Sequence, residues 1–223
     1  MTTFIVLRHA QSTANERGLL AGQLPGIHLS ATGVDEAEAI KEALSKVKID
    51  RVISSPLERC LQTIEPLVSA KKLKITIDHR LIEMNYGRWS GKKLKLLSLR
   101  PLWRKIQSSP SEVTFPDGES FSKMSLRVGK LLEELHRKFP KESILLITHG
   151  DICKFIATYF LTLPLNDLQK FLVKPASLSI YHYTSSKATV EVFNSSATKT
   201  LSITSDATRS MPGGETGKRR QAR

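Results

Sequence analysis

The chain has 223 residues, of which 40% are hydrophobic and 25% are charged, and its formal net charge is +13. This composition is typical of a globular protein and argues against global disorder. No run approaches the roughly 18 apolar residues that a membrane span needs, so no membrane partner is predicted.

The positive charge raises the possibility of a nucleic-acid partner. Six basic and two acidic residues lie beyond residue 194, which leaves a charge of +9 for residues 1–194. The basic clusters at 71–74, 92–95 and 100–105 are scattered along the chain, which is more typical of solvated faces than of a binding stripe. A nucleic-acid partner is therefore not expected, and no oligomeric state is indicated.

Strands and helices alternate along the chain. Apolar runs predict strands at 3–7, 51–55, 74–77 and 143–148, and helix-forming or amphipathic stretches predict helices at 34–44, 56–70, 121–139 and 152–161. Pro56 suits the first position of its helix. Segments 178–183 and 189–193 predict closing strands that can form a hairpin. The alternation predicts an α/β fold with a largely parallel central sheet flanked by helices.

The domain organisation follows from composition. Residues 1–194 are predicted to form one catalytic domain, with 85–118 as an irregular insertion over the sheet. Residues 195–223 form a basic tail rich in Ser, Thr and Gly, which is expected to be disordered. Cys60 and Cys153 have neither CxxC nor metal-ligand spacing. They favour free thiols in a reducing compartment, and therefore a cytoplasmic protein.

Histidines follow two of the predicted parallel strands. The first strand ends in Arg8-His9, and the strand from residue 143 ends in Thr148-His149. Because the carboxyl ends of parallel strands meet at one edge of a sheet, both imidazoles are expected there. Arg59 lies about one turn into the helix after the second strand, at the same edge. Such a cationic pocket suits a phosphoryl group, which arginine grips with paired hydrogen bonds.

Four motifs occur in order and resemble the histidine phosphatase superfamily, also called phosphoglycerate mutase-like. The resemblance covers about residues 3–184 and implies that family's three-layer sandwich. The one departure is Ala10, where the family usually has glycine. The motifs are Arg8-His9-Ala10-Gln11-Ser12-x-x-Asn15, Ser54-Ser-Pro-Leu-x-Arg59-x-x-Gln62-Thr63, Glu83-x-x-x-Gly87-x-Trp89-x-Gly91 and Thr148-His149-Gly150.

The resemblance implies a metal-independent phosphatase without a cofactor. His9 would be the nucleophile that forms a phosphohistidine, and His149 would join the arginines in holding the phosphoryl oxygens. Glu83 would protonate the leaving oxygen and then deprotonate the attacking water. A metal site at the two histidines is disfavoured because the adjacent arginines would repel a cation. The implied substrate-binding residues are Arg8, Ser12, Asn15 and Arg59.

The branch of the superfamily is indicated by other segments. Residues 115–120 resemble the proline-glycine-glutamate-serine segment of the compact phosphatase branch, and the long motif of the glycolytic mutases after the acid is missing. We therefore predict a phosphomonoesterase for a small phosphorylated metabolite. A phosphoglycerate mutase-type phosphomutase and a non-catalytic module that binds phosphorylated ligands remain alternatives. Lys92, Lys93 and Arg104 could meet a second anionic group on the substrate.

Overall fold

Six strands form one sheet in the computed structural model, which describes residues 1–184 and 187–196. The strand order is β3-β2-β4-β1-β5-β6; the first four strands run parallel, and β5 is antiparallel to both of its neighbours. The predicted largely parallel sheet and its antiparallel closing pair are confirmed. The strands are β1 (Thr2–Arg8), β2 (Arg51–Ser54), β3 (Ile75–Ile77), β4 (Ser143–Thr148), β5 (Ser177–Tyr183) and β6 (Ala188–Ser196).

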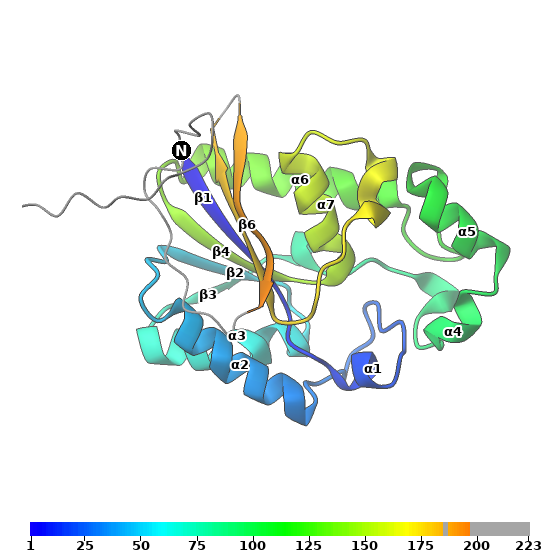
Figure 1. Cartoon of the computed structure of the whole chain (residues 1–223), viewed down its shortest axis with the longest axis horizontal. Helices are drawn as coiled ribbons and strands as arrows, with labels where there is room; N and C mark the ends of the chain where they lie inside the picture. The colour runs from blue at the N-terminus through cyan, green and yellow to red at the C-terminus, as the bar shows by residue number, and fades with distance from the viewer. Residues whose placement is uncertain (185–186, 197–223) are drawn as a thin grey trace, which may run out of the picture.

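Alternating side chains of the central strands explain why helices cover both faces of the sheet. In β1, Phe4 and Val6 belong to one hydrophobic cluster, whereas Ile5 and Leu7 belong to the other. Successive strand residues point to opposite faces, so an uninterrupted apolar strand requires a helical layer on each side. Figure 1 shows α2 and α3 on one face of the sheet and α6 and α7 on the other.

The helices agree with the sequence pattern where they are long. The short ones, α1, α4 and α5, gather at the end of the molecule toward which β1 runs (Figure 1). The α-helices are α1 (Thr13–Glu16), α2 (Ala31–Leu44), α3 (Glu58–Lys71), α4 (Leu94–Leu97), α5 (Pro101–Ser108), α6 (Phe121–Lys138) and α7 (Gly150–Phe160). The 3₁₀-helices are η1 (His79–Leu81), η2 (Gly87–Trp89), η3 (Pro110–Glu112) and η4 (Leu165–Lys170).

The structure differs from the sequence expectations at three places. Helix α3 starts at Glu58 because Leu57 has an extended backbone, so Pro56 precedes the helix rather than opening it. The segment 85–118 is partly helical, since it contains α4 and α5. Strand β6 continues to Ser196, two residues past the expected domain end, and the rest of the expected tail lies outside the described residues.

Two findings bear on the environment of the chain. Within residues 1–184 and 187–196, no helix is both long enough and apolar enough to cross a membrane. Cys60 and Cys153 are buried free thiols, as expected from their spacing, and burial raises the pKa of both. Neither thiol is therefore placed to react with solvent near neutral pH.

Candidate active site

The ends of β1 and β4 bring the two sequence-predicted histidines together. These strands pair in parallel with Arg8 opposite Thr148, and the backbone N–H of His9 donates to the Thr148 carbonyl at 2.9 Å. The imidazole centroids of His9 and His149 are consequently 5.2 Å apart. The expected meeting of the strand ends at one edge of the sheet is confirmed.

His9 is held as a neutral imidazole in one tautomer. Its Nδ1 lies 2.7 Å from the carbonyl oxygen of Ala10, and since a carbonyl only accepts, Nδ1 carries the proton. Burial, followed by the charges of Arg59 and Arg8, holds the pKa of His9 well below its usual range. The other ring nitrogen, Nε2, therefore keeps a free lone pair, as a nucleophile requires.

Ala10 fits its position without strain. It is fully buried, it is not among the residues with positive φ, and its backbone N–H donates to Thr63 Oγ1 at 2.9 Å. The same hydroxyl donates to the Arg59 carbonyl at 2.6 Å. Alanine in place of the usual glycine therefore leaves the loop tied to α3.

Two arginines, the buried Arg59 and the half-buried Arg8, present unpaired N–H groups. Arg8 donates from Nη1 to the Val173 carbonyl at 2.5 Å, and Arg59 donates from Nη2 to the Gly22 carbonyl at 2.8 Å. Arg8 Nε and Arg59 Nη1 are buried with no partner among the described residues. Buried donors are almost always satisfied in folded proteins, so an anion is the natural occupant of the space between them.

His149 positions Arg59 through a hydrogen bond. It is fully buried, with Nε2 2.7 Å from Ser55 Oγ and Nδ1 3.1 Å from Arg59 Nη2. Because a guanidinium only donates, Nδ1 accepts, and the ring proton on Nε2 points to Ser55. Burial and then Arg59 hold the pKa of His149 well below its usual range. In this neutral form His149 has no N–H for a phosphoryl oxygen, so that predicted contact needs a second ring proton.

Ser12 and Asn15 form a capping box at the start of α1. Asn15 Oδ1 accepts from the Ser12 backbone N–H at 3.0 Å and from Ser12 Oγ at 2.9 Å. Both residues line the cavity beside His9. Since Oδ1 is engaged, the amide nitrogen of Asn15 is the group left to donate to a ligand. Ser12 orients Asn15, and its own hydroxyl proton is engaged there.

Glu83 is a buried carboxyl group that lines the same cavity. It is 8% exposed, and its Oε1 accepts from the Met84 backbone N–H at 3.0 Å. Burial and then the nearby Asp151 carboxylate raise the pKa of Glu83 to about 7. A carboxyl group with this pKa can give and take a proton near neutral pH. The sequence alone left open that Glu83 is an exposed turn carboxylate, and its burial shows that it is not.

A polar chain that the sequence analysis missed adjoins Glu83. The Tyr86 hydroxyl donates to Asp151 Oδ2 at 2.8 Å, and Lys154 Nζ lies 3.2 Å from Asp151 Oδ1. Lys154 also donates to Gln169 at 2.8 Å. The only sequence signal was position, since Asp151 directly follows Thr148-His149-Gly150.

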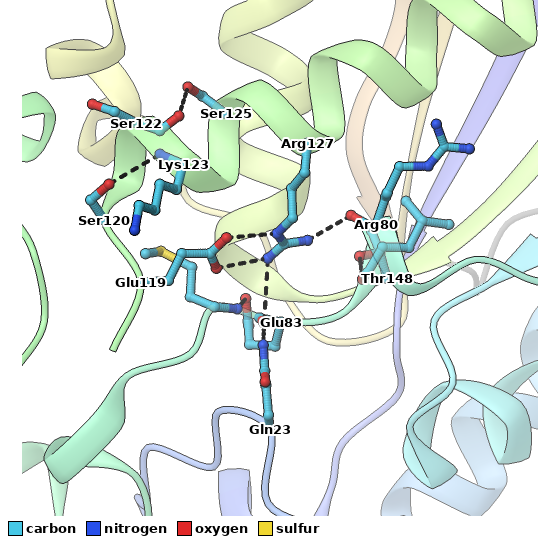
Figure 2. A network of polar contacts seen from close by, with 12 residues as sticks. Gln23, Arg80, Glu83, Glu119, Ser120, Ser122, Lys123, Ser125, Arg127 and Thr148 are labelled. Atoms are coloured by element: carbon cyan, nitrogen blue, oxygen red, sulfur yellow. Dashed lines mark hydrogen bonds and ion pairs between the residues drawn. The ribbon is translucent and has the colours of Figure 1, made fainter. Parts of the chain in front are cut away.

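The main chain of Glu83 is fixed from two sides, as Figure 2 shows. Gln23 donates to the Glu83 carbonyl at 2.7 Å, and Arg127 Nη2 donates to it at 3.4 Å. Arg127, on α6, also donates to the Arg80 carbonyl at 2.6 Å and forms a two-pronged ion pair with Glu119 at 2.8 and 3.0 Å. The Glu119–Arg127 pair thereby anchors the segment that carries Glu83.

Two glycines allow the segment 115–120 to pack against the backbone that follows Glu83. A Cβ at Gly118 would lie 2.4 Å from the Asn85 carbonyl oxygen, and one at Gly87 would lie 2.0 Å from that of Pro116. Gly87 also has a φ of +51°, a left-handed conformation that favours glycine. The two turns therefore pack backbone against backbone, which places Glu119 within reach of Arg127.

These groups surround one cavity of about 230 Å³. All predicted site residues except His149 line it. A neutral imidazole, two unpaired guanidinium edges and a carboxyl group that titrates near neutral pH together suit transfer of a phosphoryl group. The fold and cavity define an α/β enzyme that acts on phosphate esters. The predicted site residues that line the cavity, which define its phosphate-binding end, are Arg8, His9, Ser12, Asn15, Arg59 and Glu83.

Comparisons with known proteins agree with this class. The family model described as "Histidine phosphatase superfamily (branch 1)" matches residues 4–196. Phosphoserine phosphatase 1 of Hydrogenobacter thermophilus is 29% identical over 184 residues, which cover 82% of this chain and 87% of that protein. The adenosylcobalamin/alpha-ribazole phosphatase of Escherichia coli is 27% identical over 199 residues, which cover 86% of this chain and 95% of that one.

A solved structure is similar over the same region. It is that of the mycobacterial glucosyl-3-phosphoglycerate phosphatase in complex with VO3, with a TM-score of 0.79 and 26% identity, covering 87% of this chain and 99% of that chain. The chain belongs to the histidine phosphatase superfamily. It is accordingly a phosphoric monoester hydrolase with the phosphoglycerate mutase-like fold.

Proposed function

We propose that the chain hydrolyses a small phosphorylated metabolite through a phosphohistidine on His9. The observation that carries this proposal is the tautomer of His9, whose Nε2 lone pair stays free while the Ala10 carbonyl accepts from Nδ1. The unpaired donors Arg8 Nε and Arg59 Nη1 lie in the same site, where a phosphoryl group would neutralise them.

The first step transfers the phosphoryl group to the enzyme. His9 Nε2 attacks phosphorus, and the bond from phosphorus to the ester oxygen breaks. Glu83, protonated because its pKa is raised to about 7, gives its proton to that oxygen, and the alcohol leaves. Arg8, Arg59 and the amide nitrogen of Asn15 hold the phosphoryl oxygens as charge spreads over them.

The second step releases phosphate. The Glu83 carboxylate takes a proton from water, the water oxygen attacks phosphorus, and the phosphorus–nitrogen bond breaks. Inorganic phosphate leaves, and both His9 and Glu83 return to their starting states. His149 keeps Arg59 in place through both steps.

The Asp151→Asn variant is expected to shift the pH dependence of catalysis. Without the carboxylate charge, the pKa of Glu83 falls from about 7. The general acid must be protonated, so kcat/KM declines as pH rises through the Glu83 pKa, and in the variant that decline begins at a lower pH. Profiles of kcat/KM against pH with an alkyl phosphate measure this. The exposed Asp117→Asn variant should keep the wild-type profile, and an unshifted Asp151→Asn profile would contradict the electrostatic role.

The Arg127→Met variant is expected to lower kcat while KM stays nearly constant. Arg127 anchors the backbone of Glu83 without touching substrate, and slight misplacement of an acid costs up to about 100-fold in rate. The loss of its hydrogen bonds should also lower the free energy of unfolding by about 1–3 kcal/mol. The matched control is Arg137→Met, on the exposed last turn of α6. A rise in KM with unchanged kcat would assign Arg127 to binding instead.

The relatives do not fix one substrate, because their names refer to phosphoserine, alpha-ribazole and glucosyl-3-phosphoglycerate phosphatases. A phosphomutase would have to retain and reorient a phosphorylated product, which requires further cationic contacts. Lys154 is the only further cation on the described cavity wall, and it is engaged by Asp151 and Gln169. This favours hydrolysis. The buried free thiols support a cytoplasmic location, and no nucleic-acid partner is proposed.

A screen of phosphorylated metabolites tests the proposal, with release of phosphate measured for wild type and for His9→Ala. Isomerisation of 3-phosphoglycerate is followed in parallel. Wild type should release phosphate from at least one metabolite, and His9→Ala should not. Faster isomerisation than hydrolysis would make the chain a mutase. Binding of phosphorylated ligands without any turnover would make it a non-catalytic module.

A further inference from the structure

The cavity continues beyond the phosphate-binding end into a region with apolar walls. The side chains there come from three parts of the chain: the loop before α2, the turn η2, and the helices α4 and α5. Leu94 at the rim is 37% exposed, whereas Trp89 and Ile106 are nearly buried. We call this region the apolar wall; it consists of Leu19, Leu20, Trp89, Leu94, Trp103 and Ile106.

Backbone hydrogen bonds hold the segments of the apolar wall in place. The Leu20 N–H donates to the Lys92 carbonyl at 2.9 Å, and the Gly91 N–H donates to the Leu20 carbonyl at 2.8 Å. The Leu94 N–H donates to the Gly18 carbonyl at 2.9 Å. These bonds join the loop before α2 to the segment that opens α4, so the leucines of both segments are held on one side of the cavity.

The charges around the cavity disfavour a second anion on the substrate. Apart from Arg8 and Arg59, Lys154 is the only cation among the described residues that line the cavity, and Asp151 and Gln169 already engage it. The expectation that Lys92, Lys93 and Arg104 meet a second anionic group is not supported, since none of them lines this cavity. A carboxylate on the leaving group would lose hydration here and gain no unpaired cation.

We propose that the leaving group of the substrate is an uncharged alcohol with an apolar portion of about the size of an aromatic ring. This inference rests on the proposed phosphatase function and specifies its substrate class. A cavity of about 230 Å³ has room for such a group, given that an engineered apolar cavity of about 150 Å³ holds benzene. When the ring binds, it removes apolar surface of the wall from water, and this burial contributes favourable free energy to binding.

Esters with alkyl leaving groups test the inference without a difference in leaving-group activation. We compare kcat/KM for 2-phenylethyl phosphate, ethyl phosphate, O-phosphoserine and 3-phosphoglycerate. Burial of a ring against the apolar wall predicts that 2-phenylethyl phosphate exceeds each of the others by about 10- to 100-fold. A value for O-phosphoserine or 3-phosphoglycerate equal to or above that of 2-phenylethyl phosphate would overturn the inference.

Substitutions in the apolar wall test whether this wall produces the preference for the phenylethyl ester. Trp103→Ala and Leu94→Ala should each lower the ratio of phenylethyl to ethyl phosphate kcat/KM. The control is Leu99→Ala, because Leu99 is 78% exposed on the same segment and does not line the cavity. An unchanged ratio in both Trp103→Ala and Leu94→Ala would place the ring elsewhere and overturn the inference.

Binding measurements separate this inference from the proposed function. Phosphonates cannot be hydrolysed, and these three share the same anionic group, so the differences in affinity among 2-phenylethylphosphonate, ethylphosphonate and 3-phosphonopropionate report on the apolar wall. The phenylethyl compound should bind most tightly, and the carboxylate compound should gain nothing over ethylphosphonate. If this order holds but no ester is hydrolysed, the apolar wall stands and the catalytic proposal fails. If hydrolysis depends on His9 but the order is reversed, only the inference fails.

Discussion

His9→Asn is expected to lower kcat/KM for phosphate release by at least about 10⁴-fold, because removal of a nucleophile leaves only the binding groups of the site. Asparagine is smaller than histidine, and its side chain cannot form the phosphohistidine. Within the described residues the ring of His9 hydrogen-bonds to the Ala10 carbonyl and packs edge-on against His149, so the fold should persist without it, as circular dichroism and thermal unfolding would show. Steady-state release of phosphate from the best ester measures the effect.

The control for this prediction is His79→Asn, because His79 is exposed and lies outside the cavity. It should retain wild-type kcat/KM. A His9→Asn variant that is folded and still within tenfold of wild type would show that another residue attacks phosphorus. If His9→Asn loses both activity and folding, His9→Gln replaces it as the test variant, because the glutamine side chain is longer than that of asparagine. The affinity of His9→Gln for phosphate then shows whether the site is intact.

The second large effect is expected for Glu83→Gln, which should lower kcat/KM for alkyl phosphates by about 10²–10⁴-fold. Glutamine keeps the size of the side chain but cannot supply a proton to the leaving oxygen. The loss should be much smaller for p-nitrophenyl phosphate, whose leaving group departs as a stable anion. This dependence on the leaving group distinguishes a general acid from a group that only shapes the cavity.

The matched control for the acid is Glu16→Gln, on the exposed side of α1, which should behave as wild type with both kinds of ester. An equal loss for Glu83→Gln with alkyl and p-nitrophenyl esters would contradict proton donation by Glu83. Its pKa of about 7 gives an independent check, since the pH dependence of kcat/KM above neutrality should disappear in Glu83→Gln.

Much of the fold follows from local pattern. Within β4 the residues from Ile144 to Ile147 are all apolar, as a strand covered on both faces must be, and α6 shows its buried face at three- and four-residue steps. The helices of the segment 85–118 could not be predicted in this way, because α4 and α5 are too short to show a helical repeat of apolar residues. The start of α3 also depends on the backbone of Leu57, which no pattern reveals.

The candidate site also contains residues that the sequence could place and residues that it could not. Arg8, His9 and Arg59 could be placed from the sequence, because each stands at a fixed distance from the end of a parallel strand. The roles of Arg127 and Asp151 could not, since each depends on contacts more than 40 residues away along the chain. His149 lies at the predicted strand end but does not line the cavity, and its hydrogen bonds to Ser55 and Arg59 show that it supports an arginine.

The central claim is that phosphorus is bonded to His9 during turnover, and trapping of the intermediate tests it most directly. Wild-type enzyme mixed with a ³²P-labelled ester is quenched in alkali within one turnover, and the labelled peptide is identified by mass spectrometry. We predict a phosphoryl group on the peptide that contains His9, stable in base and labile in acid, and absent from His9→Asn. An acid-stable adduct, or a label on any other residue, would contradict the account.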